Sequence, residues 1–96
     1  MSRLSGRYKQ VHDVEIPAGQ DLLAPGGIID LITPEVTRPV LLKIGIIAPA
    51  GTEIQINGSS MKISDSGIFE LDYVVEVRNL VFPNGAPAST IIDFIY

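Results

Sequence analysis

A two-residue turn between two alternating runs is the feature that most constrains what this chain can fold into. Residues 51–71 read GTEIQINGSSMKISDSGIFEL, with apolar residues recurring at every second position on both sides of Asn57-Gly58. Asn-Gly favours a type I′ hairpin because both turn positions need a positive φ angle. The pairs expected from this turn are Ile56–Ser59, Gln55–Ser60, Ile54–Met61, Glu53–Lys62 and Thr52–Ile63. This register gathers the apolar side chains on one face, so it predicts a tight hairpin packed on a core.

Short segments of β-like pattern, separated by Gly, Pro, Asn and Ser, make up the rest of the chain. The further segments expected as strands are 8–16, 28–32, 40–48, 68–71, 74–82 and 91–96. No segment keeps the i, i+3, i+4, i+7 spacing of a packed helix for three turns. Residues 40–48 are apolar enough to be covered on both faces, and the apolar strand 91–96 is expected away from an open sheet edge.

These elements predict an all-β fold in one domain spanning residues 1–96. Seven or eight short strands, as a rough count, with turns between them are typical of an antiparallel β-sandwich of jelly-roll or immunoglobulin-like type. The chain has no cysteine, which excludes disulfides, thiolate metal sites and a cysteine nucleophile. The domain must therefore be held together by apolar packing.

Composition also indicates the kind of partner. Hydrophobic residues make up 46% of the chain, which is high for a small domain and favours association with other chains. The net charge of −4 disfavours nucleic acid, because nucleic-acid binders carry a basic patch. No apolar run approaches the length of a membrane helix, and the N-terminus lacks the apolar core of a secretory signal. We therefore expect a soluble protein without nucleic-acid or membrane partners.

Residues that could support catalysis or bind a metal are few. His12 is the only histidine and is followed by Asp13, but neighbours in a strand point to opposite faces and would not orient each other as in a Ser-His-Asp triad. One histidine without cysteine cannot assemble a usual zinc site within a single chain. Three-fold symmetry could bring three copies of His12 together, although nothing in the sequence indicates it. No Gly-rich loop opens a helix, so nucleotide binding has no support. We expect no catalytic residues, cofactor or metal, and a protein that is not an enzyme.

Carboxylates are the other side chains that could act in catalysis or bind a cation. Asp65, Glu70 and Asp72 lie around a Gly-containing turn, but their spacing does not match a calcium loop. We interpret them as a turn residue and two solvated strand residues. Asp93 is the only charged residue of segment 91–96. It is expected to pair with Arg78 or Lys43, or to lie at a subunit contact.

Two segments are candidates for contacts with other chains. Residues 1–9 carry Arg3, Arg7 and Lys9, and they are interpreted either as a solvated, flexible tail or as a basic arm that docks on an acidic neighbour. The apolar terminal strand is the candidate for self-association. Its interface residues are predicted to be Ile91, Ile92, Phe94, Ile95 and Tyr96.

Two stretches resemble small proteins encoded among the structural genes of tailed bacteriophages and prophages of Gram-positive bacteria. They are IGIIAPAGTEIQINGSSMKISDSGIFELD, residues 44–72, and STIIDFIY, residues 89–96. The likeness lies in Ala-Pro-x-Gly-Thr, Ile-Asn-Gly, Gly-Ile-aromatic-Glu-Leu and a terminal Ile-Ile-Asp-aromatic strand. The resemblance implies a tail, baseplate or head-decoration protein that is made in the bacterial cytoplasm and located in the virion. Its partners would be copies of itself and other virion proteins.

A small glycan- or peptide-binding module is the alternative to a virion component. Such a module would use the loops at Pro83–Pro87 and Asp72–Tyr73, where turn-forming residues and a tyrosine are available. The absence of tryptophan weakens the glycan interpretation without removing it.

Overall fold

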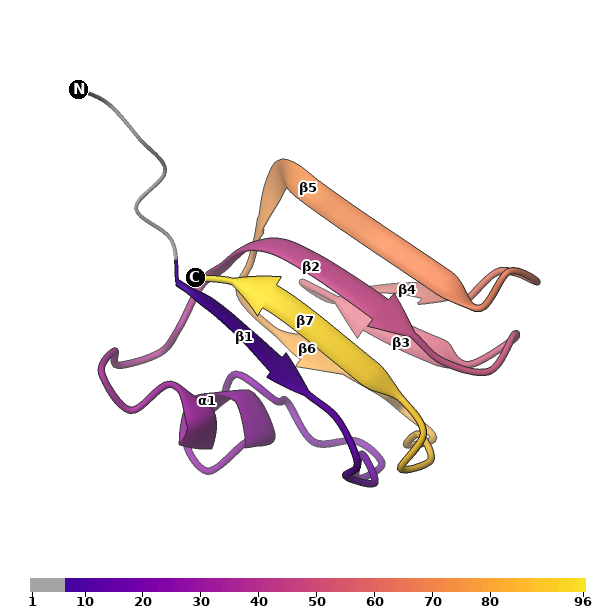
Figure 1. Cartoon of the computed structure of the whole chain (residues 1–96), viewed down its shortest axis with the longest axis horizontal. Helices are drawn as coiled ribbons and strands as arrows, with labels where there is room; N and C mark the ends of the chain where they lie inside the picture. The colour runs from indigo at the N-terminus through magenta and orange to yellow at the C-terminus, as the bar shows by residue number, and fades with distance from the viewer. Residues whose placement is uncertain (1–6) are drawn as a thin grey trace.

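The computed structural model describes residues 7–96, without the side chains of Tyr73 and Val74. It confirms the all-β prediction: two antiparallel sheets pack face to face as a small β-sandwich (Figure 1). The elements of the described chain are β1 (Tyr8–Val11), α1 (Ile28–Ile32), β2 (Leu41–Ile47), β3 (Glu53–Ile56), β4 (Ser59–Lys62), β5 (Ile68–Val77), β6 (Leu80–Val81) and β7 (Ile91–Ile95).

The strand order is that of a jelly roll. One sheet has the order β1-β7-β2-β5 and the other has the order β4-β3-β6. Segment 16–21 lies beside β6 and contributes two isolated bridges, Ile16 to Ala86 and Asp21 to Val81. With this segment counted, the strand pairs are nested: β3 with β4, β2 with β5, segment 16–21 with the chain around β6, and β1 with β7. A single antiparallel ribbon wrapped in this way is the jelly-roll arrangement.

The predicted hairpin is confirmed in every detail of its register. Asn57 and Gly58 have φ angles of 52° and 86°, as a type I′ turn requires. The four expected pairs from Ile56–Ser59 to Glu53–Lys62 are all present. The amide of Ile63 donates to the carbonyl oxygen of Thr52 at 2.9 Å, which extends the pairing by the fifth expected step.

The register of this hairpin continues into the larger sheet. Gly45 pairs with Glu70, and these two residues are equally far in sequence from the Asn57-Gly58 turn. The amide of Ala48 donates to the carbonyl oxygen of Gly67 at 3.0 Å, which bridges the two parts of the ribbon. The register shifts only near Leu41, whose partner is Val77, so that residues 73–76 of β5 form a bulge. One turn thus determines which side chains of β2 face the core.

The side chain of Asn57 fastens the hairpin tip to the rest of the domain. Its Nδ2 donates to the carbonyl oxygen of Glu76 at 2.8 Å. Its Oδ1 accepts from the amides of Arg78 at 2.7 Å and Asn79 at 3.3 Å. The turn residue therefore also satisfies backbone groups where β5 ends and the chain turns into β6.

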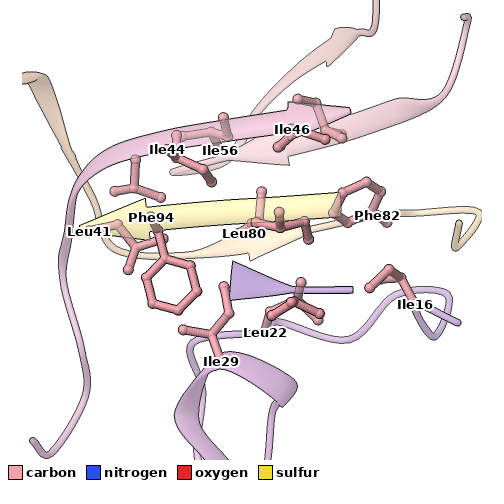
Figure 2. Close-up of a cluster of buried hydrophobic side chains, with 14 of the residues drawn as sticks. Ile16, Leu22, Ile29, Leu41, Ile44, Ile46, Ile56, Leu80, Phe82 and Phe94 are labelled. Carbon is pink, nitrogen blue, oxygen red and sulfur yellow. The ribbon is translucent and has the colours of Figure 1, made fainter. Parts of the chain in front are cut away.

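The core lies between the two sheets and is closed at one side by α1 (Figure 2). It combines side chains from both sheets, from segment 16–21 and from the helix. The largest fully buried side chains are Ile16, Leu22, Ile29, Leu41, Ile44, Ile46, Ile54, Val77, Leu80, Phe82, Ile92 and Phe94. Most of them are β-branched or aromatic, which suits the pleated surfaces they pack from.

The strand predicted at residues 28–32 is wrong, because these residues form helix α1. A Cβ at Gly27 would clash with the carbonyl oxygen of Leu22, so the chain enters the helix at a position that only glycine can fill. The hydroxyl of Thr33 donates to the carbonyl oxygen of Ile29 at 2.8 Å and closes the single turn. Tertiary packing on Ile29 has overridden the β propensity of an isoleucine-rich segment.

Three strand boundaries also differ from the prediction. β1 ends at Val11 and leaves Val14 exposed. The turn expected at Asp72–Tyr73 is absent, because both residues lie within β5, and the predicted strand 74–82 is instead divided after Val77. The expectation that residues 40–48 are covered on both faces is wrong, because Ile47 is half exposed and β2 is covered on one face only. The expectation for the terminal strand is confirmed: β7 is flanked by β1 and β2.

We predict that Asn57→Gly lowers the free energy of unfolding by about 1–3 kcal/mol, because it keeps the turn conformation but removes the three side-chain hydrogen bonds. Urea denaturation followed by circular dichroism would measure this. Asn57→Asp is the matched control, since it keeps the acceptor oxygen and loses only the donor to Glu76; its loss should be smaller. Equal stability of Asn57→Gly and the unmodified chain would contradict the structural role of this side chain.

Candidate interaction face on the four-stranded sheet

The solvent side of the β1-β7-β2-β5 sheet, hereafter the outer face, presents three rows of side chains across neighbouring strands. Figure 1 views the molecule from this side, with the three-stranded sheet behind. The strand register defines the rows. They are an apolar row of Ile91, Ile47 and Ile68, a polar row of Gln10, Asp93, Gly45 and Glu70, and a mixed row of Tyr8, Ile95, Lys43 and Asp72.

The apolar row is exposed to solvent. Ile47 is 50% exposed and Ile68 is 51% exposed, and Ile91 on the next strand is partly buried. Neighbouring strands lie about 4.8 Å apart, so these three side chains form one continuous apolar strip. Tyr8, 60% exposed, adds a further apolar surface in the mixed row. A contiguous apolar patch of this kind marks an interaction surface more often than single exposed residues do.

The polar row contains a hollow above Gly45. A cavity of about 260 Å³ opens there, between the apolar strip on one side and the carboxylates of Asp93 and Glu70. The carboxylate of Asp93 lies over Gly45, where a Cβ would meet its Oδ1. Glycine leaves room for this carboxylate, although the flexible side chain of Asp93 could also move aside. Glycine weakens the interior of a strand by roughly 0.5–1 kcal/mol.

Tyr8 and Asp93 are linked across β1 and β7. The Tyr8 hydroxyl donates to Oδ2 of Asp93 at 3.1 Å. Desolvation of the hydroxyl, together with the hydrogen bond to the Asp93 carboxylate and its negative charge, raises the pKa of Tyr8 above its ordinary value of 10.0. Asp93 is therefore not paired with Arg78 or Lys43 as expected. The guanidinium of Arg78 pairs with Glu76 instead.

The predicted self-association residues divide between the core and the surface. Ile92, Phe94 and Tyr96 are buried within the domain, which removes them from an interface formed by the folded chain. Ile91 and Ile95 lie on the outer face. The reason is the alternation of a strand: β7 is apolar on both faces, and only one of them is turned towards the solvent. Burial within the domain argues against an interface role for Ile92, Phe94 and Tyr96, and the self-association itself stays a prediction.

The basic residues expected in an N-terminal arm are part of the domain where the structure describes them. The guanidinium of Arg7 lies over the ring of Tyr96, 5.7 Å from its centroid, and the backbones of the two residues exchange both hydrogen bonds. Nζ of Lys9 donates to the carbonyl oxygen of Ile32 at 2.6 Å and lies 3.7 Å from Oε1 of Glu35. Arg7 and Lys9 therefore contact their own chain, and Arg3 lies outside the described residues.

His12 and Asp13 contact each other, contrary to the prediction. Nδ1 of His12 lies 2.9 Å from Oδ2 of Asp13, because Asp13 adopts a φ angle of 59° and leaves the strand conformation that would have separated them. Both side chains are exposed. Within residues 7–96, no serine hydroxyl is hydrogen-bonded to this pair.

The three carboxylates that were considered for a calcium site are spread over the sheet and one of its turns. Asp65 lies in the turn before β5, while Glu70 and Asp72 project from the outer face of β5. In the described part of the chain, no three His, Asp or Glu side chains are grouped so that they could hold a metal ion. None of the helices described there has the length and apolar character to cross a membrane.

The outer face was not recognised from the sequence, although one signal for it was present. Gly45 interrupts an otherwise apolar central strand, and such a glycine marks either a bulge or a close approach by another group. No family model, curated protein or solved structure matches this chain. The resemblance to phage structural proteins therefore stays a prediction.

We predict that the phenol of Tyr8 ionises at a higher pH than a free tyrosine. The folded state favours the neutral phenol, so this contribution to stability is complete below pH 10 and is lost as pH rises through the folded-state pKa. The difference in ultraviolet absorbance between the unmodified chain and Tyr8→Phe, titrated with base, isolates the Tyr8 step. In Asp93→Asn the step should move towards its ordinary position; an unchanged step would contradict the influence of Asp93.

Proposed function

We propose that this chain is a non-enzymatic structural protein that associates with copies of itself and docks on a larger particle through the outer face. The observation that carries the proposal is the exposed apolar row of Ile91, Ile47 and Ile68 on three adjacent strands. An antiparallel sheet with one solvated face normally carries polar side chains on that face. Covering a half-exposed isoleucine contributes about 1 kcal/mol, so a partner that covers the strip gains about two to three times this amount before the cost of association.

The virion assignment within this proposal has support of two kinds. The segments that resemble phage structural proteins, residues 44–72 and 89–96, supply the outer-face residues of β2, β5 and β7 except Lys43. The likeness therefore falls on the surface proposed to make the contacts. In addition, jelly rolls occur in viral capsid domains, although they also occur in lectins and cupins. We accordingly propose a tail, baseplate or head-decoration component.

A glycan- or peptide-binding module is the second candidate, and one observation favours it. An open hollow lies between segments Glu15–Ala18 and Asn84–Pro87, so the loop at Pro83–Pro87 borders a concave surface. Asp72–Tyr73 does not contribute a second loop, because it lies inside β5. Screening the chain against glycan and peptide arrays tests this candidate, and loss of a binding signal on Asn84→Ala would locate it.

We predict that the purified chain forms an oligomer and that Ile47→Thr combined with Ile68→Thr dissociates it. Threonine keeps the β-branched shape but has a hydroxyl in place of the ethyl branch of isoleucine, and a hydroxyl is unfavourable to bury without a partner. Light scattering during size exclusion, over a range of protein concentrations, measures the mass. Val14→Thr is the matched control, since Val14 is similarly exposed but lies outside both sheets.

A clean monomer at every concentration would contradict the self-association part of this proposal. An oligomer that keeps its mass in the double variant would contradict the use of the outer face. Circular dichroism of each variant shows whether it is still folded, which distinguishes dissociation of folded chains from unfolding.

A further inference from the structure

The outer face carries an excess of negative charge beside its apolar strip. Among the described residues, Glu70, Asp72 and Asp93 lie on it with one cation, Lys43. The ion pairs among the described residues are Lys9–Glu35, His12–Asp13 and Arg78–Glu76, so the carboxylates of this face are not neutralised by them. A two-fold contact that covered the whole face would bring Glu70 and Asp93 of two copies together. Opposed like charges at an interface cost several kcal/mol by rough estimate, so such a contact is disfavoured.

A complementary surface exists elsewhere on the same chain. It consists of Leu31, Val36 and Arg38, hereafter the α1 corner, and these residues border one shallow hollow. Asp30 also lines this hollow, and its Oδ2 accepts a hydrogen bond from the amide of Gly26 at 3.1 Å. Leu31 is 67% exposed, more than any other large apolar side chain of the described chain. Arg38 is exposed and has no ion-pair partner among residues 7–96. The corner thus combines an exposed apolar side chain with a cation, as the outer face combines an apolar strip with carboxylates that have no ion-pair partner among residues 7–96.

The two surfaces lie on different sides of the domain. Helix α1 flanks β1, as the contact of Lys9 with Ile32 shows, whereas Ile68 and Glu70 lie on β5 at the opposite edge of the sheet. Figure 1 shows α1 and β5 at opposite ends of the molecule. One copy can therefore offer its outer face to one neighbour and its α1 corner to another.

We propose that the occupant of the outer face is the α1 corner of a second copy of this chain, in a head-to-tail contact. This inference rests on the self-association proposed above. Leu31 covers the apolar row, and the guanidinium of Arg38 enters the hollow over Gly45 between Asp93 and Glu70. A guanidinium suits this place because its fork of N–H donors can bind two carboxylates at once. Repetition of such a heterologous contact forms a ring if the rotation closes.

Charge reversal tests the pairing of Arg38 with the acidic row. Arg38→Glu and Glu70→Arg should each weaken association on the order of tenfold or more, measured by sedimentation or by light scattering across concentrations. Glu70 is exposed and makes no side-chain hydrogen bond within the described chain, so its replacement should leave the fold intact. Lys62→Glu, on the other sheet, is the matched control and should leave the association unchanged.

Mixing the two variants gives the decisive result. A mixture of Arg38→Glu and Glu70→Arg should regain association, because every contact in an alternating ring then joins opposite charges. Carrying both substitutions in one chain should also restore association. In a symmetric contact between two outer faces, Arg38→Glu would have no effect and would need no rescue.

The outcomes separate this inference from the proposal on which it rests. If the double threonine variant dissociates while Arg38→Glu does not, the outer face is the interface but its occupant is not the α1 corner. If both reversals weaken association but the chain that carries both substitutions does not recover it, the pairing of Arg38 with Glu70 is wrong. A monomeric unmodified chain overturns both statements.

Discussion

The register of one ribbon is the constraint on which the rest of this structure depends. The Asn57-Gly58 turn fixes the pairing of β3 with β4, and the same register passes through the Ala48–Gly67 contact into β2 and β5. Because a slip of one residue exchanges the two faces of a strand, the turn also determines that Ile44 and Ile46 are buried while Gly45 and Ile47 face the solvent. The two residues of this turn therefore determine which side chains of β2 form the core and which form the surface proposed for assembly.

The parts of the fold that could be predicted are those in which local pattern and tertiary packing agree. The hairpin and the all-β architecture follow from alternation and turn chemistry, and the central position of β7 follows from its two apolar faces. The helix at Ile28–Ile32 could not be predicted, because its propensity is weak and its position depends on the close approach of Gly27 to Leu22. The contact of His12 with Asp13 was missed for a similar reason, since it requires a positive φ angle at a non-glycine residue.

The candidate site was harder to predict than the fold because it is a property of several strands at once. Ile47, Ile68 and Ile91 are far apart in sequence, and each alone is an ordinary strand residue. Only the pairing of β2 with both β5 and β7 places them in one row. The terminal strand was correctly singled out as apolar, but sequence alternation alone did not indicate which of its faces would be buried. That choice depends on the position of α1 and the three-stranded sheet behind it.

The nesting of the strand pairs also affects how the domain can form during synthesis. The innermost pair joins neighbours in sequence, whereas the outermost pair joins Tyr8 to Ile95, and long loops are slower to close. β7 lies between β1 and β2, so both of these strands leave the ribosome before the strand that separates them exists. Until β7 has emerged, their facing edges have unpaired backbone groups, and the growing chain is open to pairing with other chains.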